Sequence, residues 1–105
     1  MHIDKTVYDV IGIGIGPFNL GMAALTETLP NLRCLFFDQN PSFHWHPGML
    51  LEGARMQVPF YADLVTPVDP CSRYTFLNYL KENGRLFRFA IHENNFITRR
   101  EYNDY

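Results

Sequence analysis

The hydrophobic positions in the first third of the chain follow a strand, turn and helix pattern. A stretch rich in β-branched residues runs from Val7 to Ile13 and predicts an extended strand. Glycines follow at alternating positions, and from Asn19 to Leu29 apolar residues recur at helical spacing. Pro30 ends this helix, and the apolar run Arg33 to Asp38 is typical of a strand buried on both faces. The pattern predicts an α/β fold with two parallel strands joined by a right-handed helical crossover.

The segment 39–70 has a different character, because it is rich in Pro, Gly, His and aromatic residues and shows little periodicity. Such a stretch inside a compact domain is usually a functional loop region. Met56 to Val58 is expected to form a short strand within it. The chain is therefore expected to divide into a strand-turn-helix-strand part (1–38), a loop region (39–70) and helical segments (71–105).

Two helices are expected in the last part of the chain. One begins around Ser72 and ends at Gly84, since glycine readily adopts the left-handed conformation that follows a helix. The other begins at Arg99 and runs to Tyr105. The first helix is expected to present three apolar side chains on one face: Phe76, Leu77 and Leu80.

Composition narrows the class of protein. The 105 residues, of which 47% are hydrophobic and 19% charged, are typical of one small globular domain and not of a disordered tail. A net charge of -2 gives no reason to expect nucleic acid or an anionic membrane as partner. The uncharged run Val10 to Thr26 contains three alternating glycines, a proline and an asparagine, so neither a signal peptide nor a membrane span is expected. Cys34 and Cys71 indicate reduced thiols in a cytoplasmic protein.

The first chemical signal is a glycine turn between strand and helix. Gly12, Gly14 and Gly16 would let the backbone turn sharply and approach a pyrophosphate at the helix N-terminus. Counted from Gly14, the usual third glycine is replaced by Asn19, which weakens the generic motif. Asp38 ends the second strand about 20 residues later, where a carboxylate can accept ribose hydroxyls of FAD or NAD. The alternative is a tight turn with a surface carboxylate.

The second signal is a loop with two histidines. His44 and His46 would share a face of an extended strand, but no third ligand lies at a useful spacing, so no metal is expected. An aromatic loop that packs on the core is the plainer interpretation.

Four blocks of sequence, in order and in register, resemble the lysine and ornithine N-hydroxylases, which are flavin-dependent N-hydroxylating monooxygenases. The resemblance covers nearly all of the chain, and Asn19 is typical of this family at the third glycine position. The blocks are Gly14 to Leu20, Trp45 to Met49, Met56 to Phe60 with Asp63 to Thr66, and Tyr74 to Leu80.

The resemblance implies an enzyme in which NADPH reduces FAD and molecular oxygen is then used to hydroxylate an uncharged primary amine for hydroxamate siderophore biosynthesis. It implies that this chain is the N-terminal portion of a Rossmann-like FAD-binding domain, with the NADPH domain outside it. The chain alone would be inactive. Its uncovered apolar helix faces would favour a homo-oligomer or association with the remainder of the enzyme.

The resemblance also implies roles for individual residues. Asp38 would bind the ribose, and Gln57 would lie between the isoalloxazine ring and the substrate. None of these residues is a nucleophile or general base, so no catalytic side chain is expected and the chemistry would be centred on the flavin. The glycine turn would hold the pyrophosphate through Gly12, Gly14, Gly16, Pro17, Phe18 and Asn19. The aromatic loop would line the flavin with Trp45, His46 and Met49.

One departure from the family concerns the substrate. Enzymes that act on ornithine or lysine carry a lysine where this chain has Ala62, and that lysine pairs with the α-carboxylate of the substrate. An unpaired buried carboxylate is strongly unfavourable, so a diamine such as putrescine or cadaverine is expected. Alternatives are an ornithine or lysine substrate, with the charge supplied by Arg55 or a residue beyond Tyr105, and a non-catalytic nucleotide-binding module.

Overall fold

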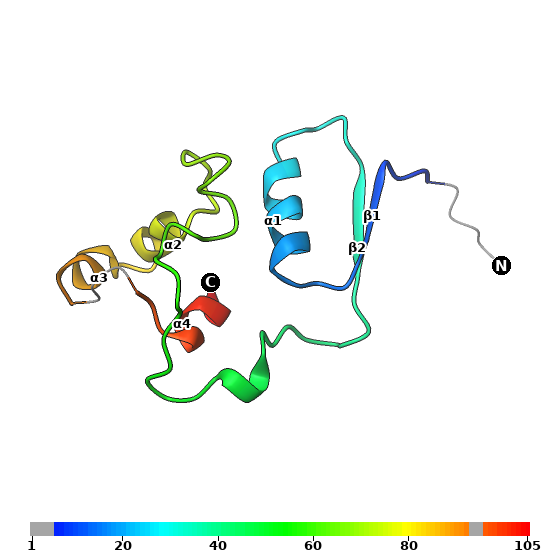
Figure 1. Ribbon diagram of the computed structural model, residues 1–105. Coiled ribbons are helices and arrows are strands. Elements are labelled where there is room, and N and C mark those ends of the chain that lie inside the picture. Colours follow the sequence, from blue (N-terminus) through cyan, green and yellow to red (C-terminus); the bar gives the residue numbers. More distant parts are fainter. Residues whose placement is uncertain (1–5, 93–95) are drawn as a thin grey trace. The chain divides into compact units, whose positions relative to one another are not determined.

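The computed structural model describes residues 6–92 and 96–105, which form two compact units (Figure 1). The first unit is Met1–Ser42 and the second is Phe43–Tyr105. Both units are built from short secondary-structure elements.

The first unit contains the predicted pair of parallel strands and the helix between them. Strand β1 spans Val10–Ile13, helix α1 spans Pro17–Thr26 and strand β2 spans Cys34–Phe37. The strands pair in parallel from Val10 opposite Cys34 to Ile13 opposite Phe37. The α/β fold and the parallel pairing are thus confirmed, although all three elements differ from the predicted bounds. Helix α1 begins two residues earlier than predicted, because Pro17 has the fixed φ that suits the first helical position.

The interior of the first unit is made of very small residues. Gly12 on β1 and Gly21 and Ala24 on α1 are its buried positions. Large apolar side chains of the same elements face solvent: Ile13 is 79% exposed and Phe18 is 95% exposed. The unit therefore has close backbone packing but little apolar burial of its own.

The second unit is built on a cluster of aromatic and aliphatic side chains. Its elements are the short 3-10 helix η1 (Pro47–Met49) and the helices α2 (Phe76–Glu82), α3 (Leu86–His92) and α4 (Arg99–Asp104). The buried residues at its centre are Phe76, Leu80, Phe89 and Ile97. Phe76 is fully buried, and its ring lies 5.3–6.2 Å from the rings of four neighbours: Tyr79, Phe89, Tyr102 and Tyr105.

Helix α2 is bounded by two caps. It begins at Phe76, later than predicted, because Thr75 is the N-cap and its side chain accepts a hydrogen bond from the Asn78 N–H. It ends as predicted near Gly84, whose φ of 69° and N–H bond to the Lys81 carbonyl complete the C-terminal cap. Phe76 and Leu80 are buried whereas Leu77 is 41% exposed, so Leu77 does not share their face as predicted.

Two features of the second unit differ from the sequence prediction. Helix α3 was not predicted, although it contributes Phe89 to the core. Met56 to Val58 does not form a strand. The backbone there makes only an isolated antiparallel bridge between Arg55 and Thr98, which is too short to propagate pairing.

The uncharged run near the start of the chain is divided between two elements. Val10–Ile13 is β1 and Pro17–Thr26 is α1, so the run is not one continuous helix. Within residues 6–92 and 96–105, no helix has the length and apolar character needed to cross a membrane.

Candidate functional site

The glycine turn joins β1 to α1 with one residue in the left-handed region. Gly14 has a φ of 89°, and its N–H donates to the Phe37 carbonyl over 2.7 Å. A side chain at this φ would be strained, which explains the glycine. Gly16 has an extended backbone and is the N-cap of α1, with Pro17 at the first helical position.

Asn19 closes the turn from inside. Its side-chain Nδ2 donates to the Gly14 carbonyl at 2.6 Å and lies 3.3 Å from the Ile13 carbonyl. By its sequence alone Asn19 is a departure that weakens the motif, whereas in the structure it fixes the turn's own carbonyl groups. The close strand-to-helix approach that a third glycine normally permits falls instead at Gly12. A Cβ built there would lie 3.2 Å from Cγ of Asn19.

Asp38 links the end of β2 to the same turn. Its Oδ2 accepts from the Ile15 N–H at 2.7 Å and its Oδ1 accepts from the Asn40 N–H at 2.7 Å. These two backbone donors, Ile15 first, lower the pKa of the Asp38 carboxyl. The group is therefore ionised at neutral pH. Because it is exposed, its remaining lone pairs are open to hydroxyl donors.

A pocket of about 380 Å³ lies at this edge of the first unit. The N-terminus of α1 adds unpaired backbone N–H groups and a positive dipole, with no acidic residue in its first turn. Backbone donors, a left-handed glycine and an ionised carboxylate beside a pocket fit the phosphate and ribose of a dinucleotide. The lining residues are Ile13, Gly14, Phe37, Asp38, Gln39 and Asn40.

The second unit holds the aromatic loop in place through Trp45. The backbone N–H of Trp45 donates to the side-chain Oδ1 of Asn103 at 2.6 Å. Its ring lies 5.2 Å from the Tyr102 ring, and the Arg99 guanidinium lies 5.4 Å from its centre. The indole Nε1 is buried and has no acceptor among the described residues. An indole N–H so placed can donate to an acceptor on a bound group or to an ordered water.

His46 has an unusual backbone. It is the one non-glycine residue with positive φ in the described part of the chain, at φ 47° and ψ 60°. This conformation costs of order 1–3 kcal/mol and marks positions that the surrounding structure holds for a reason. The His46 ring packs edge-on to Trp45 at 4.8 Å, and the His46 carbonyl accepts from the Met49 N–H.

The structure thus brings three of the predicted flavin-lining residues, Trp45, His46 and Met49, into one loop. Gln57 lies exposed on the later part of the segment. The glycine turn and Asp38 belong to the other unit. Within the described ranges, no group of three or more His, Cys, Asp or Glu side chains could hold a metal ion.

Asp63 is the polar centre of the loop region, a role that sequence reasoning missed. Its carboxylate accepts from the N–H groups of Val65 and Thr66, from the Thr66 hydroxyl, and from the N–H of Phe76 at the start of α2. The signal that could have found it was its place at the head of the family block from Asp63 to Thr66. The carboxylate fixes the loop to α2.

Ala62 precedes this centre and is held through its backbone. Its N–H donates to the Pro59 carbonyl at 3.0 Å, and its carbonyl accepts from the Tyr102 hydroxyl at 3.2 Å. Arg55, the alternative source of positive charge, donates from its guanidinium to the Phe96 carbonyl at 2.7 Å.

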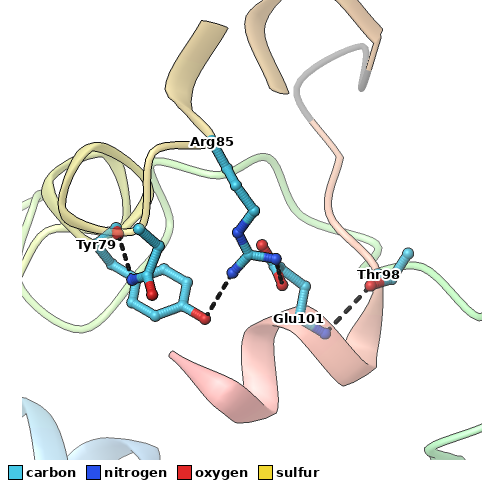
Figure 2. A network of polar contacts seen from close by, with 5 residues as sticks. Tyr79, Arg85, Thr98 and Glu101 are labelled. Atoms are coloured by element: carbon cyan, nitrogen blue, oxygen red, sulfur yellow. Dashed lines mark hydrogen bonds and ion pairs between the residues drawn. The ribbon is translucent and has the colours of Figure 1, made fainter. Parts of the chain in front are cut away.

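A polar network joins α4 to the rest of the second unit (Figure 2). Arg85, between α2 and α3, forms an ion pair with Glu101 on α4 at 2.8 Å and donates to the Tyr79 hydroxyl at 3.0 Å. Thr98 caps α4 by accepting from the Glu101 N–H. The Arg85 side chain is 42% exposed, so the ion pair orients α4 more than it stabilises the fold.

Comparison with known proteins identifies the family. The sequence matches the family described as L-lysine 6-monooxygenase/L-ornithine 5-monooxygenase over residues 6–105. It is 56% identical over 104 residues to the putrescine N-hydroxylase of Shewanella oneidensis, covering 99% of this chain and 21% of that protein.

Two solved structures have the same fold over this region. The FAD-bound cadaverine monooxygenase of the desferrioxamine pathway from Erwinia amylovora has a TM-score of 0.91 and 56% identity, covering 95% of this chain and 23% of that one. The ornithine N-hydroxylase of Kutzneria sp. 744, with reduced FAD, NADP⁺ and L-ornithine, has a TM-score of 0.89 and 47% identity, covering 94% and 24%. This chain therefore spans about a fifth to a quarter of these proteins. The chain belongs to the L-lysine 6-monooxygenase/L-ornithine 5-monooxygenase family.

Proposed function

We propose that this chain is the N-terminal flavin-binding part of an FAD- and NADPH-dependent enzyme that hydroxylates a diamine nitrogen in siderophore biosynthesis. The observation that carries the proposal is the glycine turn, in which Gly14 is left-handed and the neighbouring Ile15 N–H is bonded to Asp38. Reduced FAD, when bound, supplies the activated oxygen that is transferred to the amine nitrogen. The residues of this chain would bind the FAD, keep the amine in line and shield the flavin ring from water.

The first unit would hold the adenine dinucleotide half of FAD. Its pyrophosphate would lie against the turn and the N-terminus of α1, where backbone donors carry no competing acidic side chain. Asp38 would accept the ribose hydroxyls. The residues assigned to this part are Gly12, Gly14, Gly16, Pro17, Phe18, Asn19 and Asp38.

The second unit would shield and orient the flavin ring. Trp45, His46 and Met49 share one loop, and the buried indole N–H of Trp45 is suited to an acceptor on the cofactor. Gln57 would lie between flavin and amine. Exclusion of water by such a loop protects reactive oxygen species from wasteful decomposition and keeps the amine in line.

The apolar side chains left exposed in this chain favour association. Ile13 and Phe18 in the first unit and Phe87 on α3 are each more than three-quarters exposed. Further chain of the same enzyme, or a second copy, would cover such surfaces. The two cysteines, Cys34 and Cys71, are free, which supports a cytoplasmic location.

Replacing Gly14 by alanine in the full-length enzyme is expected to lower FAD affinity at least tenfold. The added methyl group would sit at a φ of 89° and crowd the approach of the phosphate, although no protein atom lies within 4 Å of it. The measurement is flavin content and FAD titration of the purified enzyme. Gly84→Ala is the matched control, because Gly84 also has positive φ and nothing within 4 Å of an added Cβ, but follows α2 and is not assigned to FAD. Equal flavin content in both variants would contradict the assignment of the turn.

The substrate proposal rests on Ala62, which offers no cation to a substrate carboxylate. We expect the full-length enzyme to hydroxylate putrescine or cadaverine in preference to ornithine and lysine. Ala62→Lys should reduce diamine turnover at least tenfold, because an ammonium group beside the amine site would repel the second amine of the substrate. Product formation with the four amines, measured side by side in both proteins, checks this.

Two rival functions predict other outcomes. If Arg55 supplied the missing charge, ornithine or lysine would be the best substrate and Ala62→Lys would change little. The Arg55 guanidinium already donates to the Phe96 carbonyl, which supports the diamine. A non-catalytic nucleotide-binding module would show no flavin absorbance spectrum and no product with any amine.

A further inference from the structure

The Tyr102 side chain contacts both Trp45, which we propose to line the flavin, and Ala62, which we propose to determine substrate preference. The ring of Tyr102 packs against the ring of Trp45, with centroids 5.2 Å apart. The hydroxyl of the same side chain donates to the Ala62 carbonyl at 3.2 Å. Trp45 and Ala62 are 17 positions apart in sequence, and Tyr102 contacts both of them.

Tyr102 is itself held on several sides. Its helix, α4, is oriented by the Arg85–Glu101 ion pair and capped by Thr98 (Figure 2). The side-chain Oδ1 of the next residue, Asn103, accepts a hydrogen bond from the backbone N–H of Trp45 at 2.6 Å. The Tyr102 ring also lies 6.2 Å from the fully buried ring of Phe76. With the helix and the ring fixed, the hydroxyl has a defined place from which to hold the Ala62 carbonyl.

We propose that Tyr102 is a positioning residue for the amine substrate, which holds the backbone at Ala62 in register with the Trp45 ring. This inference rests on the proposed function. Tyr102 does not touch the reacting atoms in this assignment. It fixes the distance between the wall of the flavin site and the wall of the amine site, and so the place of the amine nitrogen relative to the cofactor.

The hydroxyl is in the correct state for this task throughout the physiological range. Burial, with a smaller contribution from the charge of Asp63, raises the pKa of Tyr102 to about 12. The group therefore remains a hydrogen-bond donor wherever the enzyme works.

The test is Tyr102→Phe in the full-length enzyme, which removes the hydroxyl and keeps the ring. We expect the KM for the preferred diamine to rise about fivefold, the ratio that corresponds to one hydrogen bond of ordinary strength. A larger share of the oxygen consumed should also be released as hydrogen peroxide instead of hydroxylated amine. Flavin content and the rate of flavin reduction by NADPH should not change.

Tyr79→Phe is the matched control. It removes the same atom from the same aromatic cluster, but its hydroxyl contacts Arg85 and not the Ala62 carbonyl. Its KM and its peroxide yield should equal those of the unmodified enzyme. Tyr102→Leu, which also removes the ring contact to Trp45, should additionally perturb the flavin spectrum.

The outcomes separate the inference from the function on which it rests. An unchanged KM and product yield in Tyr102→Phe, or the same rise in Tyr79→Phe, would overturn the positioning role. So would a Tyr102→Phe protein that does not fold, because the hydroxyl would then support the fold and not the site. If the unmodified enzyme binds no flavin and hydroxylates no amine, the proposed function fails instead.

Discussion

Alanine at Gly12 is expected to lower the free energy of unfolding by about 1–3 kcal/mol, the usual effect of overpacking a closely packed interior. A Cβ at this position would overlap Cδ1 of Phe36 and lie 2.7 Å from Cε1 of the same ring, closer than real carbon atoms approach. The Phe36 ring, the Asn19 side chain or the strand itself must therefore move. Since Asn19 holds the turn, the movement should also reduce FAD binding.

Chemical denaturation of the full-length enzyme, with flavin titration alongside, measures both effects. Gly16→Ala is the control for stability, because Gly16 has extended backbone and a methyl group added there would meet nothing within 4 Å. The double variant Gly12→Ala with Phe36→Ala should recover part of the loss, since it removes the clashing ring. A Gly12→Ala protein as stable as Gly16→Ala would show that the Phe36 ring is not closely packed against Gly12.

Asp63→Ala should have the largest effect on stability, a loss of about 3 kcal/mol or more. Hydrogen bonds to a charged group contribute about 1.5–3 kcal/mol each, although they are not additive. Asp63 accepts four, including the bond to the first N–H of α2. Alanine would leave that N–H and the Thr66 hydroxyl without this acceptor and release the loop that carries Ala62.

Asp69→Ala is the comparison for Asp63→Ala. The Asp69 side chain accepts a backbone bond from the Cys71 N–H at 3.1 Å, at an exposed position. Its loss should change the free energy of unfolding by less than about 1 kcal/mol. Urea unfolding followed by the fluorescence of Trp45, the single tryptophan of this chain, reports on both variants. Similar midpoints for the two variants would contradict the central role of Asp63.

The parts of the fold that depend on neighbouring residues could be predicted from sequence. Alternating glycines between a β-branched run and a helical run predicted the turn, and its left-handed residue is Gly14. Asp38 at the end of the second strand was expected beside that turn, and its bond to the Ile15 N–H places it there. Gly84 was expected to end a helix, and it does.

The parts that depend on distant residues could not be predicted. Helix α2 begins at Phe76 and not around Ser72, because Thr75 caps it and the distant Asp63 carboxylate accepts from the Phe76 N–H. Helix α3 begins soon after the cap of α2, and its seven residues are too few to show a helical pattern separate from that of its neighbour. The contacts of Tyr102 with Trp45 and Ala62 join segments with no shared pattern.

The hydrogen bond from the backbone N–H of Trp45 to the Asn103 side chain limits the order in which the chain can fold while it is being translated. Its two partners are 58 residues apart, so the loop around Trp45 lacks its anchor while the intervening chain is being translated. At about 5–20 residues per second, that interval is roughly 3–12 s. The glycine turn and Asp38 are complete before it begins. On the ribosome, the glycine turn with Asp38 can therefore form first, and the loop around Trp45, which we propose to shield the flavin ring, is anchored only after α4 has emerged.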